Sequence, residues 1–285
     1  MKASTSGIST QRICQWFGLS RQAYYQSLKR CKQRAIDTEI IVQLTQDTRR
    51  RCGARLGTGK VYHCVKEDLR TMGMKVGRDG FYRILREQNL LIKPRRRAAH
   101  RTTDSSKWRR QFADLRQDLV VEHPEQLWVS DITYLRLSHG FAYLSLVTDA
   151  YSRQIMGWQV HEDLSTKGCL QALSRALKRR TYPASPLIHH SDRGCQYCSA
   201  EYVSELRGAN IRISMTQNGS PYENPMAESV NGQLKVEYAL DRTFDHITQA
   251  RAEVLRVIQQ YNEQRPHGSI DMEVPAERHQ KYSVA

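Results

Sequence analysis

Residues 127–149, LWVSDITYLRLSHGFAYLSLVTD, decide the fold of this chain. Apolar, β-branched and aromatic residues run through 127–137 and again through 141–149, and Ser138-His139-Gly140 between the two runs is typical of a hairpin turn. The stretch therefore predicts two antiparallel strands. Asp131 stands inside the first strand, where an acidic side chain is costly to bury unless it is paired or binds a cation.

The residues after the hairpin complete an α/β pattern. We expect a strand at 154–160, a helix at 164–179, a strand at 186–190, a helix at 200–206, a strand at 211–214 and helices at 224–240 and 248–263. Three antiparallel strands followed by alternating helices and strands is the order of an RNase H-like domain. The predicted fold is therefore a mixed five-stranded sheet with flanking helices.

The N-terminal part predicts an all-α, helix-turn-helix region. Thr10–Phe17 is the first helix, ended by Gly18, and Ser20 caps the second. Further helices are expected at 37–48, 60–71 and 78–88. We assign residues 1–92 to a helical DNA-binding region, 93–119 to a basic linker, and 120–285 to an RNase H-like catalytic core with a C-terminal helix and tail.

The charge of the chain is unevenly placed. It has 44 Lys and Arg against 29 Asp and Glu, a net charge of +15. Residues 1–110 hold 26 basic and 8 acidic residues (+18), and residues 111–285 hold 18 and 21 (−3). Such asymmetry favours a nucleic-acid partner over a basic surface that serves solubility.

The chain has no apolar run long enough to cross a membrane and no apolar core of signal-peptide type near its start. Its 7 cysteines, an odd number at irregular spacing, are typical of reduced thiols. We expect a cytoplasmic protein without a membrane partner.

Two further acidic residues lie at positions that suggest a ligand-binding role. Asp192 follows the predicted strand at 186–190, and strand ends in α/β sheets are where ligand groups project. Glu228 lies in the first turns of the long helix. Sixty residues separate Asp131 from Asp192, and thirty-five separate Asp192 from Glu228.

At these intervals the sequence resembles the DDE recombinases, the superfamily that retroviral integrases share with many bacterial transposases. The motifs WVSDITYL, HHSDRGCQYCS, MTQNGSPYENPMAESVNGQLKVE and YNEQRPH together resemble the OrfB-type transposase of the third large insertion-sequence family. The resemblance extends over nearly the whole chain. It implies metal-dependent strand cleavage and strand transfer at element ends.

The resemblance assigns the three acids to catalysis and to metal binding. Two Mg²⁺ (or Mn²⁺) ions stabilise the attacking and leaving oxygens of an in-line displacement at phosphorus, and such ions prefer oxygen ligands. Asp131 is the expected bridging ligand, with Asp192 and Glu228 each completing one metal site. The alternative is three unrelated acids that cap, pair or face solvent.

Several basic residues are candidates for DNA contact. Lys235 lies seven residues after Glu228, almost on the same helix face, and Arg193 follows Asp192 directly. Arg95, Arg96 and Arg97 belong to the basic linker. Arg265, in YNEQRPH, either binds phosphate or packs the tail against the sheet. The family also implies an OrfA partner or fusion and a homo-oligomer on DNA.

Other features are weighed against simpler interpretations. Cys195-x-x-Cys198 beside two histidines suggests zinc, but no second ligand pair follows at normal spacing. Residues 53–60 resemble a P-loop only partly, since Val61 replaces its Ser or Thr. Asp149 is expected to cap a turn, and Glu237 to face solvent.

Two other functions compete with the active transposase. One is a non-catalytic DNA-binding relic, which would gain nothing from three clustered carboxylates. The other is a nuclease of RNase H type, which would not need the basic helical region.

Overall fold

The computed structural model describes residues 9–93, 112–116, 119–217 and 224–282. Contacts between residues divide the chain into two compact units. The helical unit comprises residues 1–47 and 65–91, and the sheet unit comprises residues 48–64 and 92–285. The predicted boundaries at residues 92 and 119 stay predictions, because residues 94–111 and 117–118 lie outside the described part of the chain.

The helical unit contains α1 (Thr10–Trp16), α4 (Arg78–Glu87) and parts of α2 (Arg21–Cys52) and α3 (Thr58–Thr71). Gly18 (φ +63°) separates α1 from α2, and Ser20 Oγ accepts the backbone N–H of Ala23 at 3.0 Å, as expected of an N-cap. The buried apolar residues of this unit include Ile41, Val65, Leu69, Phe81 and Leu85.

The expected break before residue 37 is wrong, because α2 is one continuous helix of 32 residues. Its middle, KRCKQRA at 29–35, shows no apolar stripe, so periodicity alone does not reveal it. Lys, Arg, Gln and Ala are nevertheless good helix formers, and no Gly or Pro interrupts residues 21–52.

The sheet of the sheet unit has the predicted strands. They are β1 (Leu127–Leu137), β2 (Phe141–Asp149), β3 (Ile155–His161), β4 (Ile188–Ser191) and β5 (Arg212–Met215), in the spatial order β3-β2-β1-β4-β5. The first three are antiparallel neighbours, whereas β4 runs parallel to β1 and β5 runs parallel to β4. This is the mixed RNase H-like order expected from the sequence.

The predicted count of five strands is too low. A sixth strand, β6 (Thr243–Phe244), pairs with Arg136 and Leu137 at the far end of β1. Two residues are too few to show an alternating pattern, so this strand depends on the neighbour that it pairs with.

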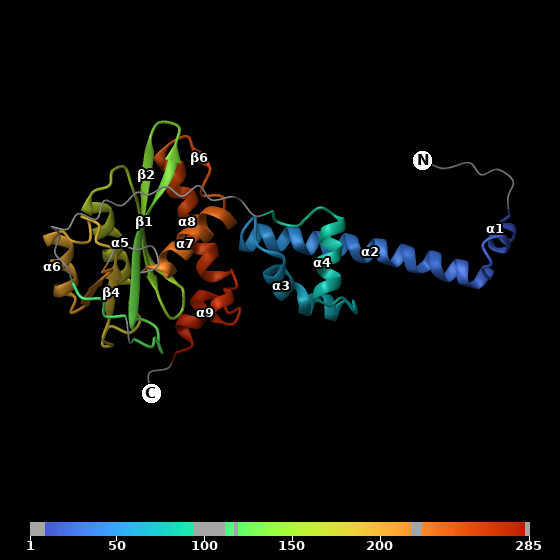
Figure 1. Ribbon diagram of the computed structural model, residues 1–285, viewed down its shortest axis with the longest axis horizontal. Coiled ribbons are helices and arrows are strands. Elements are labelled where there is room, and N and C mark those ends of the chain that lie inside the picture. The colour runs from blue at the N-terminus through green and yellow to red at the C-terminus, as the bar shows by residue number, and fades with distance from the viewer. Residues whose placement is uncertain (1–8, 94–111, 117–118, 218–223, 283–285) are drawn as a thin grey trace. The chain divides into compact units, whose positions relative to one another are not determined.

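Helices cover both faces of the sheet (Figure 1). On one side α5 (Thr166–Lys178) and α6 (Ala200–Gly208) share a core with Trp128 and Met156. On the other, α7 (Pro225–Glu237) and α8 (Ile247–Glu263) pack on Leu135 and Leu144. The sheet is thus buried on both faces and its loops are left at its ends.

Part of the predicted linker packs against the outer strand of the sheet. The backbone N–H of Leu115 donates to Ser214 Oγ at 2.9 Å, and the carbonyl of Ala113 accepts from Met215 at 3.4 Å. Within the described residues these bonds cover the free edge of β5. No helix in the described part of the chain has the length and apolar character needed to cross a membrane.

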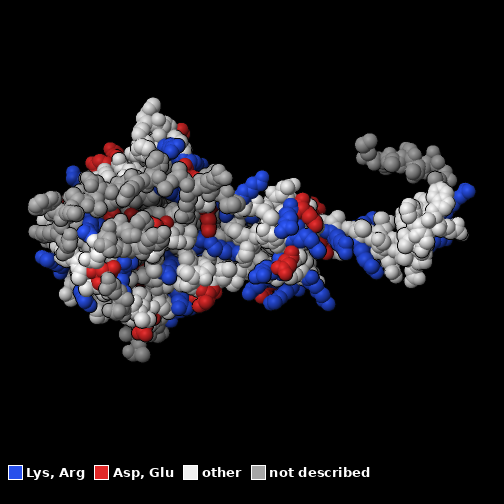
Figure 2. Space-filling view, viewed as in Figure 1, with Lys and Arg blue, Asp and Glu red and all other residues white. Residues whose placement is uncertain are grey.

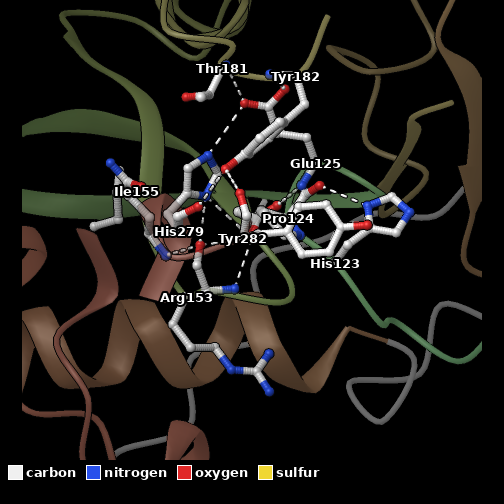
Figure 3. A network of polar contacts seen from close by, with 12 residues as sticks. His123, Pro124, Glu125, Arg153, Ile155, Thr181, Tyr182, His279 and Tyr282 are labelled. Carbon is white, nitrogen blue, oxygen red and sulfur yellow. Dashed lines mark hydrogen bonds and ion pairs between the residues drawn. The ribbon is translucent and has the colours of Figure 1, made fainter. Parts of the chain in front are cut away.

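The C-terminal α9 (Pro275–Gln280), which the sequence did not predict, is tied to the sheet by a buried polar network (Figure 3). His279 lies between two carboxylates: its Nε2 is 3.3 Å from Glu125 and its Nδ1 is 3.7 Å from Asp149. Arg180 Nε donates to Glu125 at 3.1 Å. Asp149 also accepts the backbone N–H and the hydroxyl of Ser152, which makes it the turn-capping residue that the sequence suggested.

Gly157 is required where α5 crosses β3. A Cβ at this position would lie 2.0 Å from the backbone oxygen of Ala172 and 2.9 Å from the Cβ of Ala176. We therefore expect Gly157→Ala to lower the free energy of unfolding, measured in urea, by at least about 2 kcal/mol. Gly59→Ala, which meets no atom within 4 Å, is the control and should be neutral or slightly stabilising. Equal effects of the two changes would contradict this account.

His279 predicts a dependence of stability on pH. Burial lowers its pKa, but the hydrogen bonds and charges of Asp149 and Glu125 outweigh burial and raise it to about 9. A histidine whose folded pKa is raised stabilises fully below its unfolded pKa and loses that effect as pH rises through the folded value. Stability should thus fall by on the order of 3 kcal/mol between pH 6.5 and 9. Urea unfolding of His279→Gln should show a clearly smaller fall; an unchanged profile would contradict the assignment.

Candidate active site

The site is centred on Asp131, in the middle of β1. Its half-buried carboxylate accepts the backbone N–H of Ile132 at 2.9 Å through Oδ1. Its Oδ2 accepts Asn231 Nδ2 from α7 at 2.7 Å. Asp131 pairs with Leu146 of β2, a residue of the core that α7 and α8 cover, so the carboxylate lies on the α7 side of the sheet.

Helix α7 presents one polar stripe to β1. Asn224, Glu228, Asn231 and Lys235 follow each other at intervals of four, three and four residues, which places them on one helix face. Asn224 Nδ2 donates to the carbonyl of Ser130 at 3.0 Å, and Asn231 bonds to Asp131. Glu228 lies between these two anchors, so the stripe that carries it is held beside β1.

Asp192 approaches from the neighbouring strand. It directly follows β4, which runs parallel to β1 with His190 opposite Val129. Continuing that register by two residues places Asp192 opposite Asp131. Gly194 donates its backbone N–H to Asp192 Oδ1 at 2.9 Å, and a Cβ on Gly194 would lie 2.9 Å from the same oxygen. The tight turn therefore holds this carboxylate at the end of β4.

Asp131 interacts electrostatically with the other two carboxylates. Burial is the largest cause of a raised pKa of Asp131, about 7, and the negative charges of Asp192 and Glu228 add to it. The hydrogen bonds from Ile132 and Asn231 act in the opposite direction without offsetting burial. At neutral pH the site therefore carries unfavourable negative charge.

The donor set fits a divalent cation. Within the described residues, no three His, Cys, Asp or Glu side chains are gathered closely enough to form a ready-made metal site. The three predicted ligands nevertheless supply only oxygen atoms, and the charge repulsion at Asp131 is of the kind that a cation relieves. The carboxylates thus lie within electrostatic range of one another but do not form a preassembled cage.

The predicted DNA-contact residues fall in different surroundings. Lys235 is half-buried, and this burial lowers its pKa, while attraction to Asp131 and Asp241 acts in the opposite direction, so its ammonium lies within electrostatic range of Asp131. Arg193 is half-exposed, and its Nε donates to the carbonyl of Thr216 at 2.7 Å. Arg95, Arg96 and Arg97 lie outside the described residues, as does the loop at 218–221.

Arg265 is not placed for DNA contact. Its side chain is fully buried and bonds to both carboxylate oxygens of Glu237, at 2.7 and 3.0 Å. A guanidinium in that position does not reach a phosphate, so the structure corrects the DNA-contact prediction and favours its alternative, packing of the tail. Glu237 is half-buried, because it pairs with Arg265 and Lys60, and the expectation that it faces solvent is wrong.

The two histidines near Cys195 and Cys198 have other partners. His189 Nε2 is 2.7 Å from Ser130 Oγ, and His190 Nδ1 is 2.9 Å from Ser214 Oγ. Both rings are fully buried in the sheet. They therefore support the strands that carry Asp131 and Asp192.

Asn224 and Asn231 are the functional residues that the sequence analysis missed. Their signal was present, since each lies on the same helix face as Glu228. An amide on a helix is usually exposed, however, and only the packing of α7 on β1 shows that these two are buried and bonded.

Several known proteins are similar in sequence to this chain. Models of the integrase core domain match residues 121–221 and 209–275. A Shigella sonnei protein named insertion element IS600 uncharacterized 31 kDa protein is 32% identical over 288 residues, covering 95% of this chain and 98% of that relative. The transposase InsF for insertion sequence IS3A of Escherichia coli (strain K12) is 40% identical over 154 residues. The chain belongs to the IS3 family of DDE transposases.

The matches to named transposases are partial. The InsF match covers 54% of this transposase and 53% of InsF, so the aligned region is about half of each protein. Among solved structures, the HTLV-2 integrase catalytic core domain in complex with magnesium (dimeric form) is 16% identical, with a TM-score of 0.44, and covers 56% of this chain and 99% of that one.

Family membership confirms the predicted resemblance, the insertion-sequence transposase function and the polynucleotidyl-transferase class. The alternative of a non-catalytic relic is not favoured, because the integrase core spans all three acids of this transposase.

The raised pKa of Asp131 makes a prediction about the protein in EDTA. An acid whose folded pKa is about 7 binds its proton more tightly in the folded state, so stability falls as pH rises from about 4 to 7 and stays lower above. Asp131→Asn should therefore raise the melting temperature at pH 8 more than at pH 5, measured by differential scanning fluorimetry.

Asp114→Asn is the matched control with the opposite sign. Burial raises the pKa of Asp114, but bonds from Arg116 outweigh it, and the net pKa is lowered. This change should lower the melting temperature at pH 8. An Asp131→Asn protein that is less stable than the wild type at pH 8 would refute the account.

Proposed function

We propose that this transposase cleaves DNA at the ends of its element and joins the freed 3′-hydroxyl to a second DNA, with Asp131, Asp192 and Glu228 as the catalytic carboxylates. The proposal rests on the interactions of Asp131 with two other segments, helix α7 and the residues that follow β4. Asn231 bonds to it from the helix that bears Glu228, and the charges of Asp192 and Glu228 raise its pKa.

The three carboxylates would hold two Mg²⁺ or Mn²⁺ ions, Asp131 being the shared ligand and Asp192 and Glu228 each completing one site. When bound, such ions lower the pKa of an attacking water or hydroxyl and stabilise charge on the leaving oxygen. The protein supplies the positions: β1 and β4 hold two ligands in register, and α7 brings the third. Asn231 fixes the orientation of the Asp131 carboxylate.

DNA is the proposed partner of both units. Lys235 lies within electrostatic range of Asp131, and we assign it to a phosphate next to the scissile bond. The helical unit carries more basic than acidic side chains on its surface, and Figure 2 shows them standing out along its helices. We assign recognition of the element ends to these helices, and additional phosphate contacts to Arg193 and to Arg95, Arg96 and Arg97.

Assembly completes the proposal. An OrfA segment, as partner or fusion, and a homo-oligomer on DNA would bring two element ends together, because one active site cuts one strand at a time. Joining of the cut end distinguishes this function from that of a simple nuclease.

Purified protein with Mn²⁺ or Mg²⁺ is expected to nick duplexes that carry the element's ends and to form joined products. Asp192→Asn removes one ligand charge and should lower both products by at least about a hundredfold, measured on labelled DNA in denaturing gels. Asp245→Asn, an equal change at an exposed residue of the sheet unit, should leave both unchanged. Equal activity of Asp192→Asn and wild type would refute the mechanism, and cleavage without any joining would favour the nuclease.

A further inference from the structure

The segment 48–64 joins α2 to α3, and we call it the elbow. Both helices continue from it into the helical unit, yet the elbow itself belongs to the sheet unit. It holds five basic residues, Arg49, Arg50, Arg51, Arg55 and Lys60, and no acidic residue. A carboxylate that pairs with one of these charges must therefore come from outside the elbow.

Glu237 is that carboxylate. Its Oε1 accepts Lys60 Nζ from the elbow at 2.9 Å, and both of its oxygens accept the guanidinium of Arg265. The side chain of Glu237 is 14% exposed and that of Arg265 is 0% exposed, so these charges are paired with little water between them. Buried pairs of this kind depend on each partner, because an unpaired buried charge is costly.

Other contacts fix the elbow to the end of α7 and to the end of α8. The backbone N–H of Arg55 donates to the carbonyl of Glu237 at 2.9 Å. Gly53 adopts φ +129° and lies so near the ring of Tyr238 that an added Cβ would be 3.2 Å from it. Cys52 Sγ donates to the carbonyl of Gln264 at 3.1 Å. The elbow is thus fixed to the end of α7 by backbone and side chains alike.

Glu237 is the last residue of α7, the helix whose earlier turns carry Glu228, Asn231 and Lys235. One end of this helix is therefore bonded to β1 beside Asp131, and its other end is bonded to the elbow. A helix transmits a displacement of one end to the other because its backbone hydrogen bonds keep its length nearly constant.

We propose that Glu237 is a positioning residue that couples DNA binding by the helical unit to the catalytic helix. DNA bound to the helices continuing from the elbow changes the strain on the Lys60–Glu237 bond, and α7 moves Glu228 relative to Asp131 in response. The inference rests on the proposed function, since it assigns element-end recognition to the helical unit. It gives a reason why strand cleavage would require the correct DNA on both units.

Lys60→Met is the informative variant. It removes the bond between elbow and α7 and keeps the aliphatic stem, while Glu237 retains Arg265, so no buried carboxylate is left unpaired. Glu237→Gln is less useful, because it strands two cations at once. Lys281→Met is the matched control, since Lys281 also bonds a glutamate, Glu273 at 3.1 Å, but is exposed and has a partner outside α7.

The assay compares end-specific cleavage of a long duplex carrying the element end with Mn²⁺-dependent nicking of a plasmid without ends. In the wild type and in Lys281→Met we expect the long duplex to be cleaved at least tenfold faster. In Lys60→Met the ratio of the long-duplex rate to the plasmid rate should fall towards one. The reason is a lower kcat for the long duplex, while the rate of plasmid nicking is unchanged. Lys60→Arg, which keeps the charge, should restore most of the ratio. A purely structural brace would lower both activities together.

Hydrogen exchange followed by mass spectrometry tests the same coupling without a variant. Binding of the long duplex in EDTA should change exchange in the last turn of α7 and in the elbow of the wild type. Unchanged exchange there, or a Lys60→Met protein that keeps the full ratio, overturns the coupling while leaving the proposed function intact. A wild type that binds the duplex but never cleaves it overturns the proposed function, and the coupling with it.

Discussion

The hydrogen bond from Asn231 to Asp131 is the interaction on which the site depends. It is 2.7 Å long and joins an α-helix to the central strand of the sheet at a residue where burial and neighbouring carboxylates make negative charge unfavourable. A carboxylate that is desolvated and faces two other carboxylates must be held in place by the protein. Asn231 does so, and because Glu228 lies one turn earlier on the same helix, the bond that orients Asp131 also positions Glu228.

The C-terminal end of α7 is held by ion pairs. Glu237 answers buried Arg265 and the Lys60 of a basic elbow, so the helix is anchored by charge at its end and by amides near its start. The polar groups of α7 therefore serve the site along the whole helix, and the apolar residues Val230 and Leu234 fix it to the sheet. A helix held in this way is rigid enough to fix the position of Glu228 relative to Asp131.

The fold follows closely from local pattern. The apolar, β-branched and aromatic runs at 127–137 and 141–149 set β1 and β2 at their observed limits, because strands covered on both faces carry nearly continuous apolar residues. Pattern was insufficient in three places: the polar middle of α2, the two-residue β6, and α9, whose stability comes from the buried bonds of His279. In each of them the element depends on propensity or on a partner distant in the chain, which periodicity does not record.

For the site, the sequence by itself determined the residue types and their intervals: the three acids, Lys235, and the strand and helix positions that carry them. They follow from the joint occurrence of the three motifs at these two intervals, since any one of the acids alone would be a weak signal. Only the tertiary structure decided what each polar residue faces. It pairs buried Arg265 with Glu237 and turns Asn224 and Asn231 towards β1. It also places the two histidines of HHSD beside serine hydroxyls. The physical reason is that a charge or amide acquires its role from the groups around it, and those groups come from segments far apart in the chain.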